Sequence, residues 1–456
     1  MRNSTLVLVL TGLLATAPAF CGSLLLISID GLPPGYVTDA DRLGLKIPNL
    51  RRFLNDGAHA TGVVGVVPTV TYPSHTTIVS GVLPAEHGIV SNTPFDPLNT
   101  NRDGWFWYAQ DIKVPTLWTA ASRAKLRTAS VNWPVTVGEA HIATLLPEYW
   151  RVSNADDLKL LRALSRPAGR LEQLEAKLGP FVDGYEDTLE SDRVRARFAV
   201  EILRADKPQF MAVHLVALDG AQHRDGPFAP AVFDVLEALD AMVGELSAAA
   251  RANDPATTVA LISDHGFIKT HTAVNLRVRL VDAGLITLER GTPSDAAGNV
   301  SSWDAQVWPG GATAAVMLRE PQNADLRKRV ADLLASIASD SRNGIARVWS
   351  SRELDGTSGF PGAAFLVEFA PGFYFGTAAR GELLTPATSK GTHGYLPQRP
   401  EMHASFFIQG PGITAGRNLG QVDMRQIAPT LAHVLAIELP TARQPMLPVF
   451  EAEQRK

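Results

Sequence analysis

Two apolar runs constrain the fold of this 456-residue chain more than any other feature. Leu24–Ile29 and Thr257–Ile262 are short and mostly apolar, and an aspartate follows each within two residues. Strands that are buried on both faces have this composition, and they belong to parallel sheets covered by helices. Helical patterns alternate with further strand patterns along much of the chain. The sequence therefore predicts an α/β fold, a mostly parallel sheet with helices on both faces.

The stretch Pro68–Gly81 contains a turn with several hydroxyl groups. Ala58–Val67 before it is predicted to be a buried strand, and Thr76–Ser80 is predicted to open a helix. Thr71 would then lie beside a helix N-terminus, whose free N–H groups and partial positive charge suit a phosphate. Thr71 is therefore a candidate nucleophile. Ser74 is the alternative, although a serine at the start of a helix is more simply interpreted as its cap.

The alternation of strands and helices divides the chain into parts. A core is predicted from residue 22 to residue 440, closed by an amphipathic helix over Val422–Ile437. The alternation weakens at about 135–191, which predicts an insertion or cap. A smaller α+β excursion is expected at about 285–390, and residues 441–456 are expected to form a tail.

The N-terminus has the composition of a signal peptide. Arg2 precedes the apolar run Leu6–Leu14 and the small residues of Ala15–Ala19, so residues 1–21 are predicted to be removed on export. Cys21 is the only cysteine, which excludes an internal disulfide in the mature chain. No later apolar run is long enough to span a bilayer. A net charge of −4 and a pI near 6.3 do not indicate the basic surface that binding a nucleic-acid duplex requires. These features predict a periplasmic or secreted protein.

Aspartate and histidine residues gather where predicted strands end, which is where open α/β sheets place their ligand sites. Each residue has an ordinary alternative, because an aspartate after a strand often forms a turn and a lone histidine is often a structural hydrogen-bonder. Carboxylate and imidazole groups together are zinc ligands, and three of each could form two adjacent sites. The candidate ligands are Asp30, Asp219, His223, Asp264, His265 and His393.

Over about residues 24–439, the chain resembles a known family. The segments that carry the resemblance occur in the family's order: Ile29-Asp30-Gly31, Pro68-Thr69-Val70-Thr71-Tyr72-Pro73-Ser74-His75, Pro84-Ala85-Glu86-His87-Gly88-Ile89-Val90-Ser91-Asn92, Asp219-Gly220-Ala221-Gln222-His223, Ser263-Asp264-His265-Gly266 and Thr392-His393-Gly394-Tyr395. They resemble the nucleotide pyrophosphatase/phosphodiesterase family, the type I phosphodiesterases of the alkaline phosphatase superfamily.

The resemblance implies an alkaline-phosphatase-like fold and a metal-dependent hydrolase. Thr71 is implied to be a metal-activated nucleophile that forms a phosphothreonine intermediate, and Asn92 to donate to a phosphoryl oxygen. Tyr72 is implied to contact the leaving group of a nucleotide or another small phosphodiester. One zinc is implied to be held by Asp30, Asp264 and His265 and to contact Thr71. The other is implied to be held by Asp219, His223 and His393.

Other functions remain open from the sequence. A phosphomonoesterase is the nearest, because Lys125-Leu126-Arg127 has the Lys-x-Arg spacing of some monoesterases, although the pair lies at the start of a predicted strand. Asn132-Trp133-Pro134 favours the diesterase. A sulfatase is disfavoured by the lack of a Cys-x-Pro-x-Arg type motif. A transferase of a phospho-head-group would use the same site, and a non-catalytic binding module is disfavoured by the complete ligand set. The oligomeric state is not readable.

Overall fold

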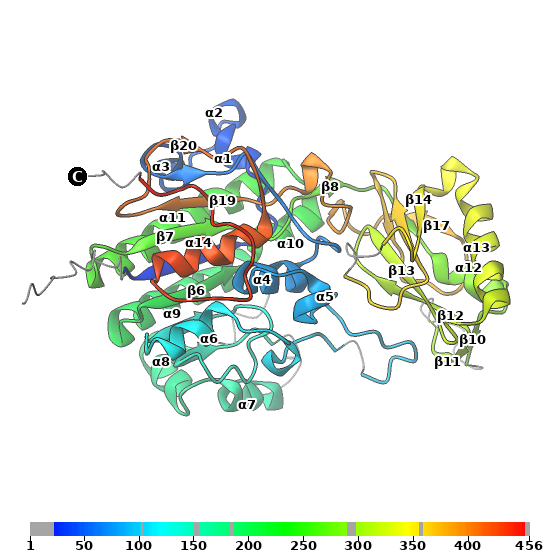
Figure 1. Cartoon of the computed structure of the whole chain (residues 1–456), viewed down its shortest axis with the longest axis horizontal. Coiled ribbons are helices and arrows are strands. Elements are labelled where there is room, and N and C mark those ends of the chain that lie inside the picture. Colours follow the sequence, from blue (N-terminus) through cyan, green and yellow to red (C-terminus); the bar gives the residue numbers. More distant parts are fainter. Residues whose placement is uncertain are drawn as a thin grey trace, which may run out of the picture.

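The structure is a computed structural model that describes residues 22–101, 104–149, 155–181, 187–289, 298–354 and 359–451. The predicted signal peptide lies outside these residues. Figure 1 shows a large α/β unit beside a smaller sheet-and-helix unit. Within the described ranges, no helix combines the length and apolarity that a bilayer crossing requires.

The large unit is built on one sheet, to which the described residues contribute eight strands. The five strands from β7 to β5 run parallel, whereas β19 is antiparallel to both of its neighbours. This arrangement confirms the predicted mostly parallel sheet. In spatial order the strands are β20 (Arg417–Asn418), β2 (Ala58–His59), β19 (Phe406–Gln409), β7 (Thr258–Ile262), β1 (Leu24–Ile29), β6 (Phe210–Leu215), β4 (Thr128–Val131) and β5 (Thr144–Leu146).

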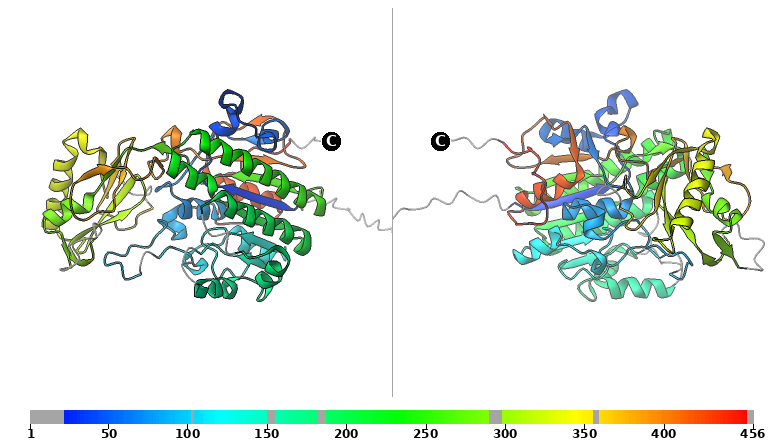
Figure 2. Two further views of the ribbon diagram at one scale, coloured as in Figure 1. Left: turned by 180° about the vertical axis from the view of Figure 1, so that it is seen from behind. Right: turned by 45° about the vertical axis from the view of Figure 1, so that its right-hand side comes forward.

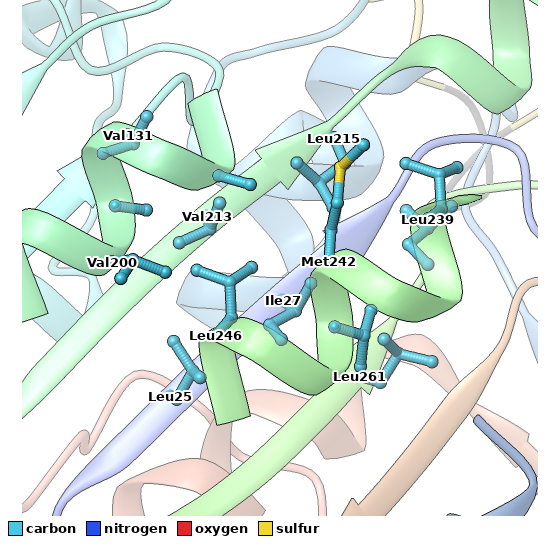
Figure 3. Close-up of a cluster of buried hydrophobic side chains, with 14 of the residues drawn as sticks. Leu25, Ile27, Val131, Val200, Val213, Leu215, Leu239, Met242, Leu246 and Leu261 are labelled. Carbon is cyan, nitrogen blue, oxygen red and sulfur yellow. The ribbon is translucent and has the colours of Figure 1, made fainter. Parts of the chain in front are cut away.

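Helices cover both faces of this sheet, as the views in Figure 2 show. The central strand β1 is buried throughout, and its side chains alternate between two cores. Leu25 and Ile27 pack against one layer of helices (Figure 3), and Leu24 and Leu26 face the other. The first layer contains α3 (Pro48–Asp56), α9 (Leu189–Asp206) and α11 (Pro230–Asn253); the second contains α4 (Thr71–Ser80), α6 (Leu117–Arg123) and α14 (Ile427–Val434).

Several short elements complete the large unit. The segment 135–191, which was predicted to be an insertion, supplies β5 at the edge of the sheet. It also carries the short helices over Ala155–Leu164 and Arg170–Leu178. The predicted tail packs back as far as residue 451, where Leu447 and Val449 are buried against the core. The short elements are α1 (Gly35–Thr38), α2 (Ala40–Leu43), β3 (Gly62–Val64), α5 (Pro84–His87), α7 (Ala155–Leu164), α8 (Arg170–Leu178), α10 (Ala217–Asp225) and β21 (Gln421–Asp423).

The smaller unit forms around an antiparallel sheet in the order β12-β13-β15-β14. One helix, α13 (Ala324–Ala338), packs on this sheet and closes a separate apolar core. The strands are β12 (Ala305–Pro309), β13 (Thr313–Leu318), β15 (Phe365–Phe369) and β14 (Ile345–Ser350). Around them lie β8 (Ile268–Lys269), β9 (Thr272–Val274), α12 (Leu276–Asp282), β10 (Ile286–Leu288), β11 (Val300–Trp303), β16 (Phe373–Phe375), β17 (Leu384–Pro386) and β18 (Gly391–Thr392).

Three local predictions were wrong. The expected strand Ala58–Val67 is two short strands, β2 and β3, which pair with different partners. The helix α4 begins at Thr71, five residues before the expected Thr76. The closing helix proper begins at Ile427, because a 3-10 turn over Met424–Gln426, capped by Asp423, precedes it. In each case particular hydrogen-bond partners decide the boundary, and apolar periodicity does not register them.

Candidate metal centre and nucleophile

The six predicted ligands converge at the carboxyl end of the main sheet. Asp30 follows β1, and Asp264 and His265 follow β7, the strand that pairs with β1 in parallel register. Asp219 and His223 project from α10, which begins two residues after β6. His393 follows β18, which packs near α10. Parallel strands end at the same edge of a sheet, so the topology alone brings most of this set together.

Their ligand atoms form two overlapping groups. In one group, Asp30, Asp264 and His265 each offer an atom within 4.8 Å of the others. In the second group, Asp219, His265 and His393 do the same. The rings of His265 and His393 stack at 3.6 Å, so His265 lies between the two groups. His223 joins the second group through its Nε2, which lies 3.3 Å from Asp219 Oδ2.

Several of these buried atoms have no hydrogen-bond partner in the described part of the chain. They are Asp30 Oδ1, Asp219 Oδ1, Asp264 Oδ2 and both ring nitrogens of His265. Buried polar atoms are normally paired, because an unpaired one costs about 1–3 kcal/mol. Five such atoms within the two groups therefore fit bound cations, and carboxylate and imidazole donors fit divalent zinc.

Two histidines are already oriented as ligands by backbone carbonyls. His223 Nδ1 donates to Gly391 O at 2.8 Å, and His393 Nδ1 donates to Thr69 O at 3.0 Å. These hydrogen bonds leave Nε2 of each ring without its proton and facing Asp219. Metal-binding histidines are commonly oriented in this way.

The electrostatics of the site also favour cations. Burial, reinforced by Asp264, raises the pKa of Asp30 well above its usual range, and burial together with Asp30 raises the pKa of Asp219. Burial lowers the pKa of His223 to about 4, so this ring is neutral at pH 7. Three buried carboxylates and a neutral imidazole are unfavourable together unless positive charge is bound among them.

Thr71 is the first residue of α4 and so lies at a helix N-terminus, which agrees with its predicted place beside one. The helix terminus, however, offers fewer donors than expected, because the Tyr72 N–H donates to Asn92 Oδ1 at 2.9 Å and Pro73 has no N–H. The Thr71 N–H is what remains of the first three amides. Since Asn92 uses Oδ1 to accept from Tyr72, its Nδ2 is the group that can donate to a ligand.

Ser74 does not cap α4, which corrects the sequence interpretation. The residue before the helix is Val70, and Ser74 lies inside the first turn, fully buried. Its hydroxyl has no hydrogen-bond partner among the residues described. His75 has a structural role, since its Nδ1 donates to Thr71 O and its Nε2 bonds Ser28 Oγ, each at 2.8 Å. His87 likewise bonds Thr77 Oγ1 at 3.0 Å and accepts from Ile89 N–H at 3.1 Å.

Tyr72 is less available to a substrate than its sequence position suggested. Its ring is fully buried and meets Trp105 edge to face, with centroids 5.1 Å apart. Its hydroxyl donates to Glu148 Oε1 at 3.0 Å. A leaving group could therefore stack on Tyr72 only if these neighbours moved.

Sequence reasoning missed two polar residues behind the site, Glu148 and His214. His214 Nε2 donates to Asp30 Oδ2 at 3.0 Å, and its Nδ1 lies 3.2 Å from Glu148 Oε2. Burial lowers the pKa of His214, but the hydrogen bonds to both carboxylates outweigh burial and raise the pKa to about 10. A histidine inside the otherwise apolar strand β6 was the one signal available, and no pattern marked Glu148.

Comparison with known proteins decides the family. Residues 24–396 match the family described as type I phosphodiesterase / nucleotide pyrophosphatase. The chain belongs to this family. The predicted resemblance is therefore confirmed, and both aspartate-histidine groups lie within the matched residues 24–396.

The chain is similar to several curated relatives over part of their length. It is 24% identical over 263 residues to an uncharacterised pyrophosphatase/phosphodiesterase of Schizosaccharomyces pombe, a match that covers 55% of this chain and 46% of that protein. It is 25% identical over 252 residues to ectonucleotide pyrophosphatase/phosphodiesterase family member 1 of Rattus norvegicus, which covers 53% and 24%. A venom phosphodiesterase of Macrovipera lebetinus is 26% identical, with 53% and 25% covered. The chain thus spans half or less of the relatives it matches.

The solved structures show the same fold. Murine ectonucleotide pyrophosphatase / phosphodiesterase 5 superposes with a TM-score of 0.62 at 18% identity, covering 93% of this chain and 96% of that one. An inactive threonine-to-alanine form of that murine protein, in complex with AMP, superposes with a TM-score of 0.61. The alkaline-phosphatase-like α/β fold is therefore established for this chain.

Proposed function

We propose that the protein is an exported phosphodiesterase that uses two zinc ions and cleaves phosphodiester or phosphoanhydride bonds. The observation that carries the proposal is the set of five buried ligand atoms that have no hydrogen-bond partner among the described residues. They lie near Thr71, because His75 Nδ1, which bonds Thr71 O, is 3.7 Å from Asp264 Oδ2. Asp30, Asp264 and His265 would hold one ion, and Asp219, His223 and His393 the other. When bound, the two ions supply Lewis-acid activation of the nucleophile and stabilise the entering and leaving oxygens.

Thr71 would carry the covalent step. Its Oγ loses a proton to solvent and forms a bond to phosphorus while the bond from phosphorus to the leaving oxygen breaks. The leaving oxygen takes a proton from water. A water molecule then attacks the phosphothreonine, and its oxygen replaces Thr71 Oγ, which is reprotonated. Asn92 Nδ2 and the Thr71 N–H would donate to the phosphoryl oxygens during both displacements.

Diesters suit this pocket better than monoesters. A monoester carries an additional negative charge, which basic side chains near the nucleophile would have to offset. The Lys-x-Arg pair lies elsewhere, because Arg127 precedes β4 and donates to Lys207 O and Gln209 Oε1 at the amino edge of the sheet. Nucleotides are the substrate class we favour, in keeping with the AMP complex of the murine neighbour.

We propose that the leaving group binds near Tyr72, against the aromatic rings that surround it. Tyr72 is part of an aromatic cluster beside Thr71 that includes Trp107 and Tyr149, with Trp105 half-buried at its border. A planar leaving group could bind against this cluster without displacing Tyr72.

Export follows from the predicted signal peptide. The names of the relatives include ectoenzymes and venom enzymes, which agrees with a periplasmic or secreted location. N-terminal sequencing of the mature protein would test the proposal, and we expect the mature chain to begin near residue 22. A mature protein that begins at Met1 in the cytoplasm would contradict it.

The catalytic proposal is tested by comparing bis-p-nitrophenyl phosphate with p-nitrophenyl phosphate on zinc-loaded protein. We expect the diester to be preferred, a chelator to abolish activity, and Thr71→Ala to lower kcat at least about 10³-fold. Thr71→Ser, which keeps a hydroxyl, is the matched control and should retain more activity than Thr71→Ala. Mass spectrometry of acid-quenched protein should find phosphate on Thr71. Full activity of zinc-loaded Thr71→Ala would exclude this mechanism, and preference for the monoester would favour the phosphomonoesterase.

A further inference from the structure

A chain of buried hydrogen bonds runs from the residue after the nucleophile to a proposed metal ligand. The Tyr72 hydroxyl donates to Glu148 Oε1 at 3.0 Å. Glu148 Oε2 lies 3.2 Å from His214 Nδ1, and His214 Nε2 lies 3.0 Å from Asp30 Oδ2. All four side chains are buried. These hydrogen bonds connect the first turn of α4, the 135–191 segment, β6 and the end of β1.

This arrangement is costly to place in a core. Glu148 and His214 lie where apolar side chains would pack without a desolvation penalty, and a buried ion pair often gives no net stability over an apolar replacement. Neither group contacts solvent, and each is held at both ends. A contribution to stability alone therefore explains the pair poorly, which directs attention to what its two ends hold.

At one end, His214 fixes the rotation of a carboxylate. By donating to Asp30 Oδ2, it turns Oδ1 toward His265 Nε2, which lies 3.4 Å away. Asp30 Oδ1 is one of the atoms without a hydrogen-bond partner in the described structure. His214 Nδ1 is itself anchored by Asn132 O at 3.1 Å, so the imidazole cannot turn freely.

At the other end, Glu148 fixes the first turn of α4. It accepts from the hydroxyl of Tyr72, and the backbone N–H of Tyr72 donates to Asn92 Oδ1 at 2.9 Å. Tyr72 therefore connects Glu148 to the proposed phosphoryl donor and, along the backbone, to Thr71. One continuous path relates the proposed nucleophile, its phosphoryl donor and a metal ligand.

We propose that Glu148 and His214 are positioning residues that align the Thr71 end of α4 with the metal site. His214 presents Asp30 Oδ1 to an ion, and Glu148 sets the position of Tyr72 relative to that ion. This inference rests on the proposed function, because it requires the two-zinc site. Hydrogen bonds to metal-binding groups commonly change metal affinity about 10- to 100-fold when they are removed.

Two amide substitutions at residue 214 separate the ends of the ring. In His214→Gln the amide can reach the position of Nε2 and still donate to Asp30, whereas in His214→Asn it reaches the position of Nδ1 and faces Glu148 instead. Both variants lose the ionisable ring, so charge cannot distinguish them. We expect zinc affinity at one site, measured by competition with a chromogenic chelator, to fall at least about tenfold in His214→Asn and less than about threefold in His214→Gln.

A second variant tests the end at Tyr72. Tyr72→Phe removes the hydrogen bond to Glu148 and leaves Asp30 with its partner. We expect both zinc affinities to stay within about twofold of the wild type, while kcat for bis-p-nitrophenyl phosphate falls about tenfold at unchanged KM. This split between affinity and turnover is not what a general loss of packing produces. Melting temperatures of the metal-free proteins check folding, and Tyr72→Phe decides the question if both variants at 214 fail to fold.

The outcomes separate the inference from the function on which it rests. Equal zinc affinities in folded His214→Asn and His214→Gln, or unchanged kcat in Tyr72→Phe, would overturn the positioning role while the wild type still binds two zinc ions. A wild type that binds no zinc would instead overturn the proposed function and, with it, this inference. The predicted pattern of losses in all three variants would establish the positioning role.

Discussion

The two proposed metal groups are built differently. Asp30, Asp264 and His265 lie at the ends of two neighbouring parallel strands, and their side chains are at most 5% exposed. Asp219, His223 and His393 come instead from a helix and a loop that meet only through tertiary packing. The side chain of His223 is 34% exposed. We call these sets the strand-end group and the helix-loop group.

This contrast teaches which part of the site is fixed and which can adapt. Strand register holds the strand-end group, so its geometry changes only if the sheet changes. The helix-loop group depends on α10 and the segment near β18, whose backbones are linked by Lys390 N–H donating to His223 O. We therefore expect the strand-end group to bind its ion more tightly, and the helix-loop group to exchange its ion and admit substrate.

The largest effect should follow from damage to the strand-end group. Asp264→Asn keeps the size of the side chain but removes a buried negative charge beside His265, 3.1 Å away. We expect kcat/KM for bis-p-nitrophenyl phosphate to fall about 10³-fold or more, without recovery at high zinc. Activity measured across a zinc titration checks this, and recovery at millimolar zinc would show that the strand-end group is the weaker one.

A smaller and reversible effect should follow from damage to the helix-loop group. In His223→Gln one neutral ligand is lost from a partly open site, so we expect kcat/KM to fall about 10²-fold at limiting zinc and to recover at excess zinc. His271→Gln is the matched control, because His271 is exposed and its side chain hydrogen-bonds only Thr272 Oγ1 among the described residues. Loss that excess zinc does not reverse would remove the distinction between the two groups.

Acid stability separates loss of metal from loss of the fold. Burial lowers the pKa of His87 to about 3, below the value of about 6.5 for an unfolded chain. The unfolded state therefore binds more protons, and the stability that the neutral ring provides is present above pH 6.5 and is lost as the pH falls toward 3. For this group the loss is at most about 1.4 kcal/mol per pH unit.

The test uses metal-free protein, in which neither group holds an ion. His87→Asn cannot titrate but keeps an acceptor for the Ile89 N–H. We expect the free energy of unfolding in urea to fall less steeply from pH 6.5 to pH 4 in this variant than in the wild type. Parallel slopes would assign acid sensitivity to other groups, His75 first, since burial also lowers its pKa to about 3.

The strand-end group and the helix-loop group also differ in how much of each could be predicted from the sequence. Asp30 and Asp264 were predictable because each follows an apolar strand, and parallel strands end at one edge. Asp219, His223 and His393 were also candidates by residue type, but only the resemblance grouped them at one ion, because their meeting depends on packing across more than 160 residues of chain. Periodicity alone could not have placed them, because a helix and a loop leave no shared register.

The errors near Thr71 have a common cause. The start of α4, the burial of Tyr72 and the interior position of Ser74 all depend on what packs against the first turn of the helix. Asn92 takes the Tyr72 N–H, and Glu148 takes its hydroxyl. These partners lie 20 and 76 residues away, so no local rule for caps or turns includes them.

The smallest effect is expected at the amino ends of the parallel strands, which lie opposite both metal groups. Lys125→Ala and Arg127→Ala together remove the basic pair that a monoesterase would need near its nucleophile. Arg127 bonds Lys207 O and its N–H bonds Gln209 Oε1, both just before β6 and one strand length from the site. We therefore expect the ratio of diester to monoester turnover to stay within about twofold of the wild type, with a loss of stability below about 1 kcal/mol. A selective loss of p-nitrophenyl phosphate turnover would mean that this pair reaches the phosphoryl group. The site would then contain a third, basic component besides the two metal groups.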